Sequence, residues 1–112
     1  MDLVHLREQL KKHKELLKKI KQTDNVNKLL PTLNDEEVNL LLKILHLIGD
    51  GQISILSKHE ETVKKAKRQK RLLTLGSRYF FRELMKKERS EKLKELRQFA
   101  SLFSIFIDSM FH

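Results

Sequence analysis

The sequence contains no cysteine, which excludes disulfide bonds, thiolate metal sites and cysteine nucleophiles. One proline and three glycines are also few for 112 residues. Strand-rich folds need many tight turns, and tight turns use these two residues, so their scarcity favours long helices joined by few connections. No stretch of about 18 or more consecutive apolar residues occurs, so we expect no membrane-spanning helix.

Positive charge is abundant and unevenly distributed. The chain carries 24 lysines and arginines against 15 aspartates and glutamates, a net charge of +9. Three segments are basic, namely Met1–Gln22 (seven basic and three acidic residues), Gly51–Leu75 (seven and two) and Gly76–Gln98 (eight and four). Thr23–Asp50 is acidic (two and five), and Phe99–His112 holds one acidic residue and no lysine or arginine. This layout indicates a protein with a cationic surface and an apolar end.

We predict an all-α fold for residues 1–112, a single domain built as a small bundle of about four helices with an intermolecular helical interface. The predicted helices cover about residues 3–22, 35–48, 57–86 and 91–110. The first and last rest on apolar residues at alternating three- and four-residue spacing. In the first helix His13 falls on this apolar stripe. Whether the third helix continues through Gly76 is left open.

The second predicted helix has the strongest local signals. Asn34 can cap its first turn, and Glu37 stands three residues later, as in a capping box. Apolar residues between Val38 and Ile48 then cover nearly every direction around the axis. Because a helix that is apolar all round is normally buried, we expect this one at the centre of the bundle.

A cluster of cations in the third helix is the main candidate binding site. These side chains fan over more than half of the helix circumference and could neutralise phosphates along a nucleic-acid backbone. The simpler interpretation is a solvated helix face. With two further arginines, the candidate residues for a nucleic acid or an acidic partner are Lys64, Lys65, Lys67, Arg68, Lys70, Arg71, Arg78 and Arg82.

Three consecutive aromatic residues, Tyr79, Phe80 and Phe81, lie between the last two of these arginines. They could stack on bases, although core packing is the commoner role of such residues. Tyr79 has a polar tip and is the one that we expect to face solvent. A helix-turn-helix with Gly76 in its turn is not supported, because bulky Leu72 takes the position that needs a small residue.

We expect no enzymatic activity, no cofactor, no metal and no small-molecule substrate. The sequence has neither a glycine-rich phosphate loop nor a nucleophile elbow. No two of the five histidines are three or four residues apart, and no acidic cluster accompanies them at ligand spacing.

The last predicted helix is more apolar than the edge helix of a four-helix bundle needs to be. Its apolar part, Phe99–Phe111, has thirteen residues and would form a helix of about 20 Å, which is too short to cross a bilayer. An exposed patch of this kind favours association, so we predict a homo-oligomer. The predicted self-association residues are Phe99, Leu102, Phe103, Phe106, Ile107, Met110 and Phe111.

Three functions remain open from the sequence. The first is a small cytoplasmic or, in a eukaryote, nuclear accessory protein that binds nucleic acid without reading its sequence. The second is a non-enzymatic adaptor or inhibitor whose basic face docks on an acidic protein. The third is a peripheral membrane module, which we do not expect, because the last helix has only a narrow polar line and interfacial helices carry a broad charged face.

Overall fold

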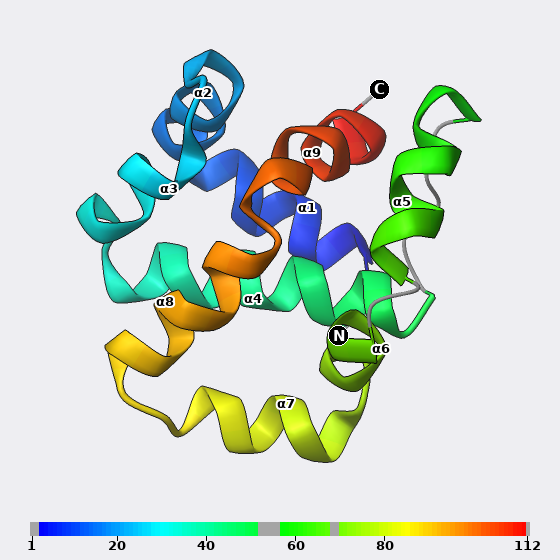
Figure 1. The fold of residues 1–112 in the computed structure, drawn as a ribbon. Coiled ribbons are helices and arrows are strands. Elements are labelled where there is room, and N and C mark those ends of the chain that lie inside the picture. Colours follow the sequence, from blue (N-terminus) through cyan, green and yellow to red (C-terminus); the bar gives the residue numbers. More distant parts are fainter. Residues whose placement is uncertain (1–2, 52–56, 68–69, 112) are drawn as a thin grey trace.

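The computed structural model describes residues 3–51, 57–67 and 70–111 (Figure 1). Every regular element in these ranges is helical. In chain order they are α1 (Leu3–Lys12), α2 (Lys14–Gln22), α3 (Val26–Leu29), η1 (Leu30–Thr32), α4 (Asp35–Gly49), η2 (Ser57–His59), α5 (Glu60–Lys67), α6 (Lys70–Leu75), α7 (Arg78–Met85), α8 (Arg89–Gln98), η3 (Ala100–Leu102) and α9 (Phe103–Phe111). The predicted all-α fold is confirmed for this part of the chain.

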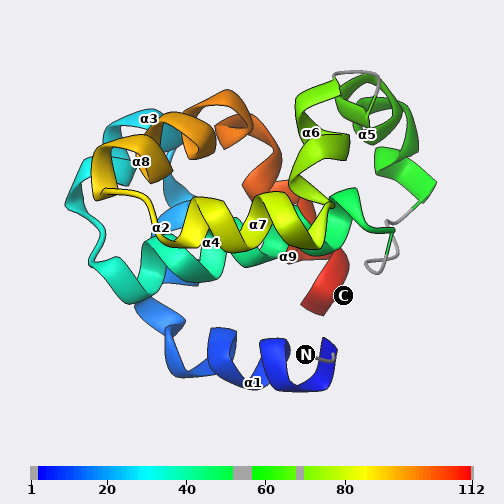
Figure 2. The ribbon, with the colours of Figure 1, turned by 90° about the horizontal axis from the view of Figure 1, so that it is seen from below.

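Helix α4 lies at the centre, as predicted. Figure 1 shows α7 and α9 on opposite sides of it, and Figure 2 shows α8 and α1 on the other two sides. The capping box is present: Asn34 Oδ1 accepts from the Glu37 N–H at 2.8 Å, and Glu37 Oε1 accepts from the Asn34 N–H at 2.9 Å. Apolar side chains along α4, among them Leu41, Ile44 and Leu45, are fully buried. This helix organises the core.

The capping box gives the first testable expectation. Asn34→Ala removes the acceptor for the Glu37 N–H and should lower the free energy of unfolding by about 1 kcal/mol. Asn34→Gly should lower it by only a few tenths of that, because glycine is tolerated at this position. Urea unfolding of the two variants and the unmodified protein checks this, and an Asn34→Ala variant as stable as the unmodified protein would show that the side-chain bond contributes nothing.

The number of helices differs from the prediction of about four. Within the described residues the predicted helix 3–22 is two helices that meet at His13, and 91–110 is interrupted at Phe99. The predicted helix 57–86 consists of η2, α5, α6 and α7, with the last break at Gly76 and Ser77. Its thirty residues would be about 45 Å long as one helix. The molecule measures 35 × 30 × 27 Å, so a helix of that length does not fit.

The break at His13 also links the N-terminal helices to α4. His13 has φ −105° and ψ 48°, outside the helical region, and its Nε2 lies 3.2 Å from Glu36 Oε1. The break turns the chain so that Leu6 and Leu10 of α1 and Leu16 of α2 are all fully buried. The predicted apolar stripe is therefore divided between two helices of different direction (Figure 1), and in the second helix Leu16 is fully buried whereas Leu17 is half-buried.

The apolar face of the last predicted helix is buried inside a single chain. Phe103, Phe106 and Ile107 have no exposed surface, Phe99 is 1% exposed and Leu102 is 6% exposed. The expectation that the last helix leaves an exposed apolar patch is therefore wrong for these five residues, because they are buried among the other helices of their own chain (Figure 1). The side chains of Met110 and Phe111, the other two predicted self-association residues, lie outside the described part of the structure. Self-association itself stays a prediction.

Candidate nucleic-acid interface

The predicted basic cluster is only partly described. Lys64 and Lys65 are exposed on α5, with no ion pair in the described part of the chain. The side chains of Lys67, Arg68, Lys70 and Arg71 lie outside the described residues. The geometry of a candidate interface therefore has to be built from α7, which carries the two remaining predicted arginines.

Helix α7 begins at a side-chain cap. Ser77 Oγ accepts from the Phe80 N–H at 3.4 Å, which fixes the helix start just after the Gly76 turn. The inward side of α7 then packs on the core through half-buried Phe80 and Phe81 and through Leu84, which is 5% exposed. With one side of the helix occupied in this way, the residues on the opposite side are exposed to solvent.

Contacts with α4 hold α7 in place. The ring of Phe81 stacks on His46 of α4, with centroids 4.3 Å apart and planes inclined by 16°. His46 Nδ1 in turn lies 2.8 Å from the Leu75 carbonyl oxygen at the end of α6. A carbonyl only accepts, so Nδ1 carries the proton and donates. One buried histidine thus joins α4, α6 and α7.

The outward residues of α7 form a surface that we call the basic–aromatic face, made of Arg78, Tyr79, Arg82 and Lys86. All four side chains are exposed, and Tyr79 is 76% exposed. Arg82 stands three residues after Tyr79 and four after Arg78, so the three side chains are neighbours on the helix surface. Lys86 lies 3.5 Å from Glu83, an exposed pair of little energetic consequence.

Tyr79 stands out among the apolar and aromatic side chains. It is the most exposed of the large ones in the described residues, ahead of Val4 at 64% and Leu73 at 55%. The expectation that Tyr79, and neither phenylalanine beside it, faces solvent is confirmed. An exposed aromatic ring between two guanidinium groups can stack on a base while the cations meet phosphates.

Two other cations of this region serve the fold. Arg89 Nη1 donates to Asp35 Oδ1 at 3.1 Å, and its Nη2 donates to the carbonyl oxygens of Pro31 and Leu33. Lys92 Nζ donates to Asn39 Oδ1 at 3.0 Å. These bonds attach α8 to the start of α4, so neither side chain is available to a partner.

A similar contact joins η2, just before α5, to α9. Asp108 Oδ2 lies 3.2 Å from His59 Nε2 and 3.3 Å from Lys58 Nζ. The hydrogen bond with His59, and then the one with Lys58, lowers the pKa of the Asp108 carboxyl. Lys58 is thus paired within the chain, in contrast to Lys64 and Lys65.

A second exposed basic surface was not among the predicted sites. It lies on α1 and α2 and consists of Lys11, Lys12, Lys14, Lys18, Lys19 and Lys21. Figure 1 shows α2 and α7 on opposite sides of α4, so the two basic surfaces are separate. The net charge of +4 of the first 22 residues is the sequence feature that indicated this surface. However, a lysine-rich surface without an aromatic residue is typical of a solvated helix.

Comparisons with protein-family models, curated proteins and solved structures give no match. The functional argument therefore depends on the geometry of this chain. No group of three or more histidines, aspartates and glutamates comes together as a metal site would require within the described residues. Among these residues no helix has both the length and the apolar character needed to cross a bilayer.

Proposed function

We propose that this protein binds single-stranded nucleic acid without reading its sequence, through the basic–aromatic face of α7. The observation that carries the proposal is the 76% exposure of Tyr79 between exposed Arg78 and Arg82. A base stacks on the tyrosine ring whatever its identity, because every base has a π-face. The arginines, with Lys86, then neutralise neighbouring phosphates.

Single strands suit this face better than a duplex does. In a duplex the bases are stacked on each other and the tyrosine ring has no free base to contact, whereas a single strand presents unstacked bases. Exposed Lys64 and Lys65 on α5 add positive charge that raises the association rate. An acidic partner protein would use the same cations but would leave the exposed ring of Tyr79 without a role.

The sequence offers a direct probe for this proposal. Tyr79 is the only tyrosine and there is no tryptophan, so tyrosine emission reports this one ring. Addition of oligo-dT at low salt should quench the emission, and added salt should restore it. Tyr79→Ala should weaken binding by about 5- to 150-fold, which corresponds to about 1–3 kcal/mol of stacking, while Tyr79→Phe should retain most of the affinity.

The role of the two arginines is tested separately through the salt dependence of the affinity. This affinity is measured by fluorescence anisotropy of a labelled oligonucleotide. Each single-strand phosphate neutralised contributes about −0.7 to the log–log slope, so Arg78→Gln with Arg82→Gln should make the slope less negative by about 1.4. Lys18→Gln on α2, on the far side of α4, is the matched control and should leave it unchanged. Equal affinity for poly-L-glutamate and oligo-dT would refute base stacking and favour the acidic-partner hypothesis.

A further inference from the structure

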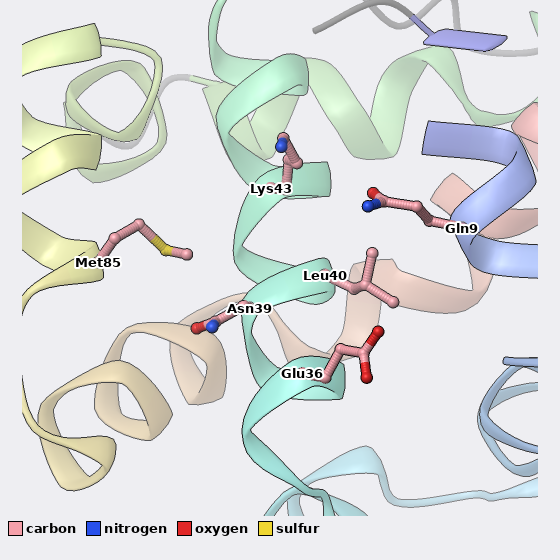
Figure 3. A pocket seen from close by; sticks show the side chains of 6 residues that line it. All are labelled: Gln9, Glu36, Asn39, Leu40, Lys43 and Met85. Atoms are coloured by element: carbon pink, nitrogen blue, oxygen red, sulfur yellow. The ribbon is translucent and has the colours of Figure 1, made fainter. Parts of the chain in front are cut away.

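A cavity on α4 lies apart from the basic–aromatic face. Glu36, Asn39, Leu40 and Lys43, at spacings of three, four and seven residues, share one stripe of α4. Gln9 of α1 and Met85 at the end of α7 reach toward this stripe from opposite sides (Figure 3). The cavity that they line is partly open to solvent and measures about 140 Å³. It exists because α1 and α7 cover two sides of α4 and leave this stripe between them.

One end of the cavity is cationic. Lys43 is half-buried, and burial lowers the pKa of its ammonium group. No carboxylate of the described residues lies within ion-pair distance of it, in contrast to Lys58 or Arg89. A cation that has lost hydration without gaining a counter-charge is stabilised when an anion binds.

The other end, where the cavity opens to solvent, is anionic, and the Glu36 side chain there is 76% exposed. Glu36 lies two helical turns before Lys43, about 10.5 Å along the axis. One carboxylate oxygen, Oε1, is 3.2 Å from His13 Nε2, and Oε2 has no described partner. The cavity therefore has a carboxylate with one uncommitted oxygen at one end and an uncompensated ammonium at the other.

The groups between the two charges are amides and apolar side chains. Asn39 Oδ1 accepts from Lys92 Nζ, and since an ammonium only donates, the oxygen of this amide is identified and its NH₂ group is left to donate. Gln9 supplies a second amide, while Leu40 and Met85 supply apolar surface. Hydrogen-bond donors and an apolar wall thus separate opposite charges.

We infer that this cavity binds a small zwitterion, whose carboxylate pairs with Lys43, whose ammonium pairs with Glu36 and whose short aliphatic body contacts Leu40 and Met85. Two ion pairs of about 3 Å each leave about 4–5 Å of the axial separation for a body of a few carbon atoms. A volume of about 140 Å³ is roughly ten times the 10–15 Å³ that a cavity needs to hold one water molecule, which leaves room for a ligand of that size. This site is independent of nucleic-acid binding.

The test uses 4-aminobutanoate as the probe, with butanoate and butylamine as matched compounds that each keep one charge. Binding is followed by NMR on full-length protein labelled at the methionine methyl groups, because Met85 lines the cavity. We expect a saturable shift of the Met85 signal with 4-aminobutanoate, at least tenfold weaker binding of each single-charge compound, and a rise in the pKa of Lys43 on binding.

Variants assign the two charges. Lys43→Met and Glu36→Gln should each weaken 4-aminobutanoate binding at least tenfold, while the exposed controls on α2, Lys18→Met and Glu15→Gln, should leave it unchanged. Butanoate binding as tightly as 4-aminobutanoate would overturn the role of Glu36, and the absence of any saturable Met85 shift would overturn the site. The compound series is measured on the unmodified chain, so the result stands even where a variant is poorly folded.

Discussion

Gly76→Ala is expected to lower the free energy of unfolding by about 3 kcal/mol, although glycine-to-alanine changes in helical proteins are often neutral or stabilising. The backbones of α4 and of the α6–α7 turn meet at Gly49 and Gly76. A Cβ atom at Gly76 would lie 2.5 Å from the carbonyl carbon of Gly49, 2.6 Å from its oxygen and 2.8 Å from the nitrogen of Asp50. All three are backbone atoms, so the helices themselves would have to separate.

The same substitution at the other glycine of the pair, Gly49→Ala, gives an independent measurement. A Cβ atom at Gly49 would lie 2.4 Å from the Leu72 carbonyl oxygen and 2.7 Å from the nitrogen of Gly76. Gly49 is the last residue of α4, where alanine would gain at most about 1 kcal/mol in helix propensity. The close contact outweighs that gain, so Gly49→Ala should also be strongly destabilising, and a stabilised variant would show that the two backbones are further apart.

Gly51 is the matched control for both variants. It has φ +77°, and a Cβ atom there would meet nothing within 4 Å. Gly51→Ala should therefore lower the free energy of unfolding by only about 1–2 kcal/mol, from the left-handed backbone alone, and Gly51→Asn by less. Urea unfolding of the four variants separates close packing from backbone conformation. At Gly49 and Gly76 φ is not positive, so only packing contributes.

Phe103→Ala is the second change with a large expected effect, a loss of about 3–5 kcal/mol. The ring has no exposed surface in the chain, and alanine would leave a cavity that the neighbouring helices cannot fill. Small domains are stable by only about 5–15 kcal/mol, so this one truncation removes much of the total. Leu73→Ala, at a leucine that is 55% exposed, is the control and should change stability by about 0.5 kcal/mol or less.

The same unfolding experiment addresses self-association. If the face of α9 is buried within its own chain, the urea midpoint of the unmodified protein should not depend on protein concentration. A dimer that buries this face would unfold at higher urea as the concentration rises, and sedimentation equilibrium would show twice the monomer mass. Either of these results would show that the chain self-associates and would support the predicted homo-oligomer.

The parts of the structure that were predictable have local causes. The capping box of Asn34 and Glu37 joins residues three apart, so it can be recognised from the sequence alone. The central place of α4 follows from apolar residues on all its sides, which leave no direction for solvent. Tyr79 was expected to face outward because its hydroxyl prefers water, and phenylalanine lacks that group.

The helix breaks at His13 and Phe99 were not predicted, because the apolar spacing continues through both positions. The predicted stripe that contains Leu6, Leu10 and Leu17 continues through His13 without a change of spacing, yet the helix ends there. The break lets Leu10 of α1 and Leu16 of α2 both be fully buried, on helices of different direction, and this need arises only from tertiary packing. His13 instead pairs with Glu36, a residue 23 positions away.

The candidate sites also combine features with local causes and features that depend on tertiary packing. The sequence by itself determined that the protein is helical, that α4 is buried and that α7 combines cations with aromatic residues, because each depends on the order of neighbouring residues. Only the tertiary structure decided that Gly49 meets Gly76, that the face of α9 is covered, and that Gln9, α4 and Met85 enclose one cavity. Each of these features involves segments that are far apart in the chain. They come together because the chain packs into a small volume, and no local sequence pattern encodes that packing.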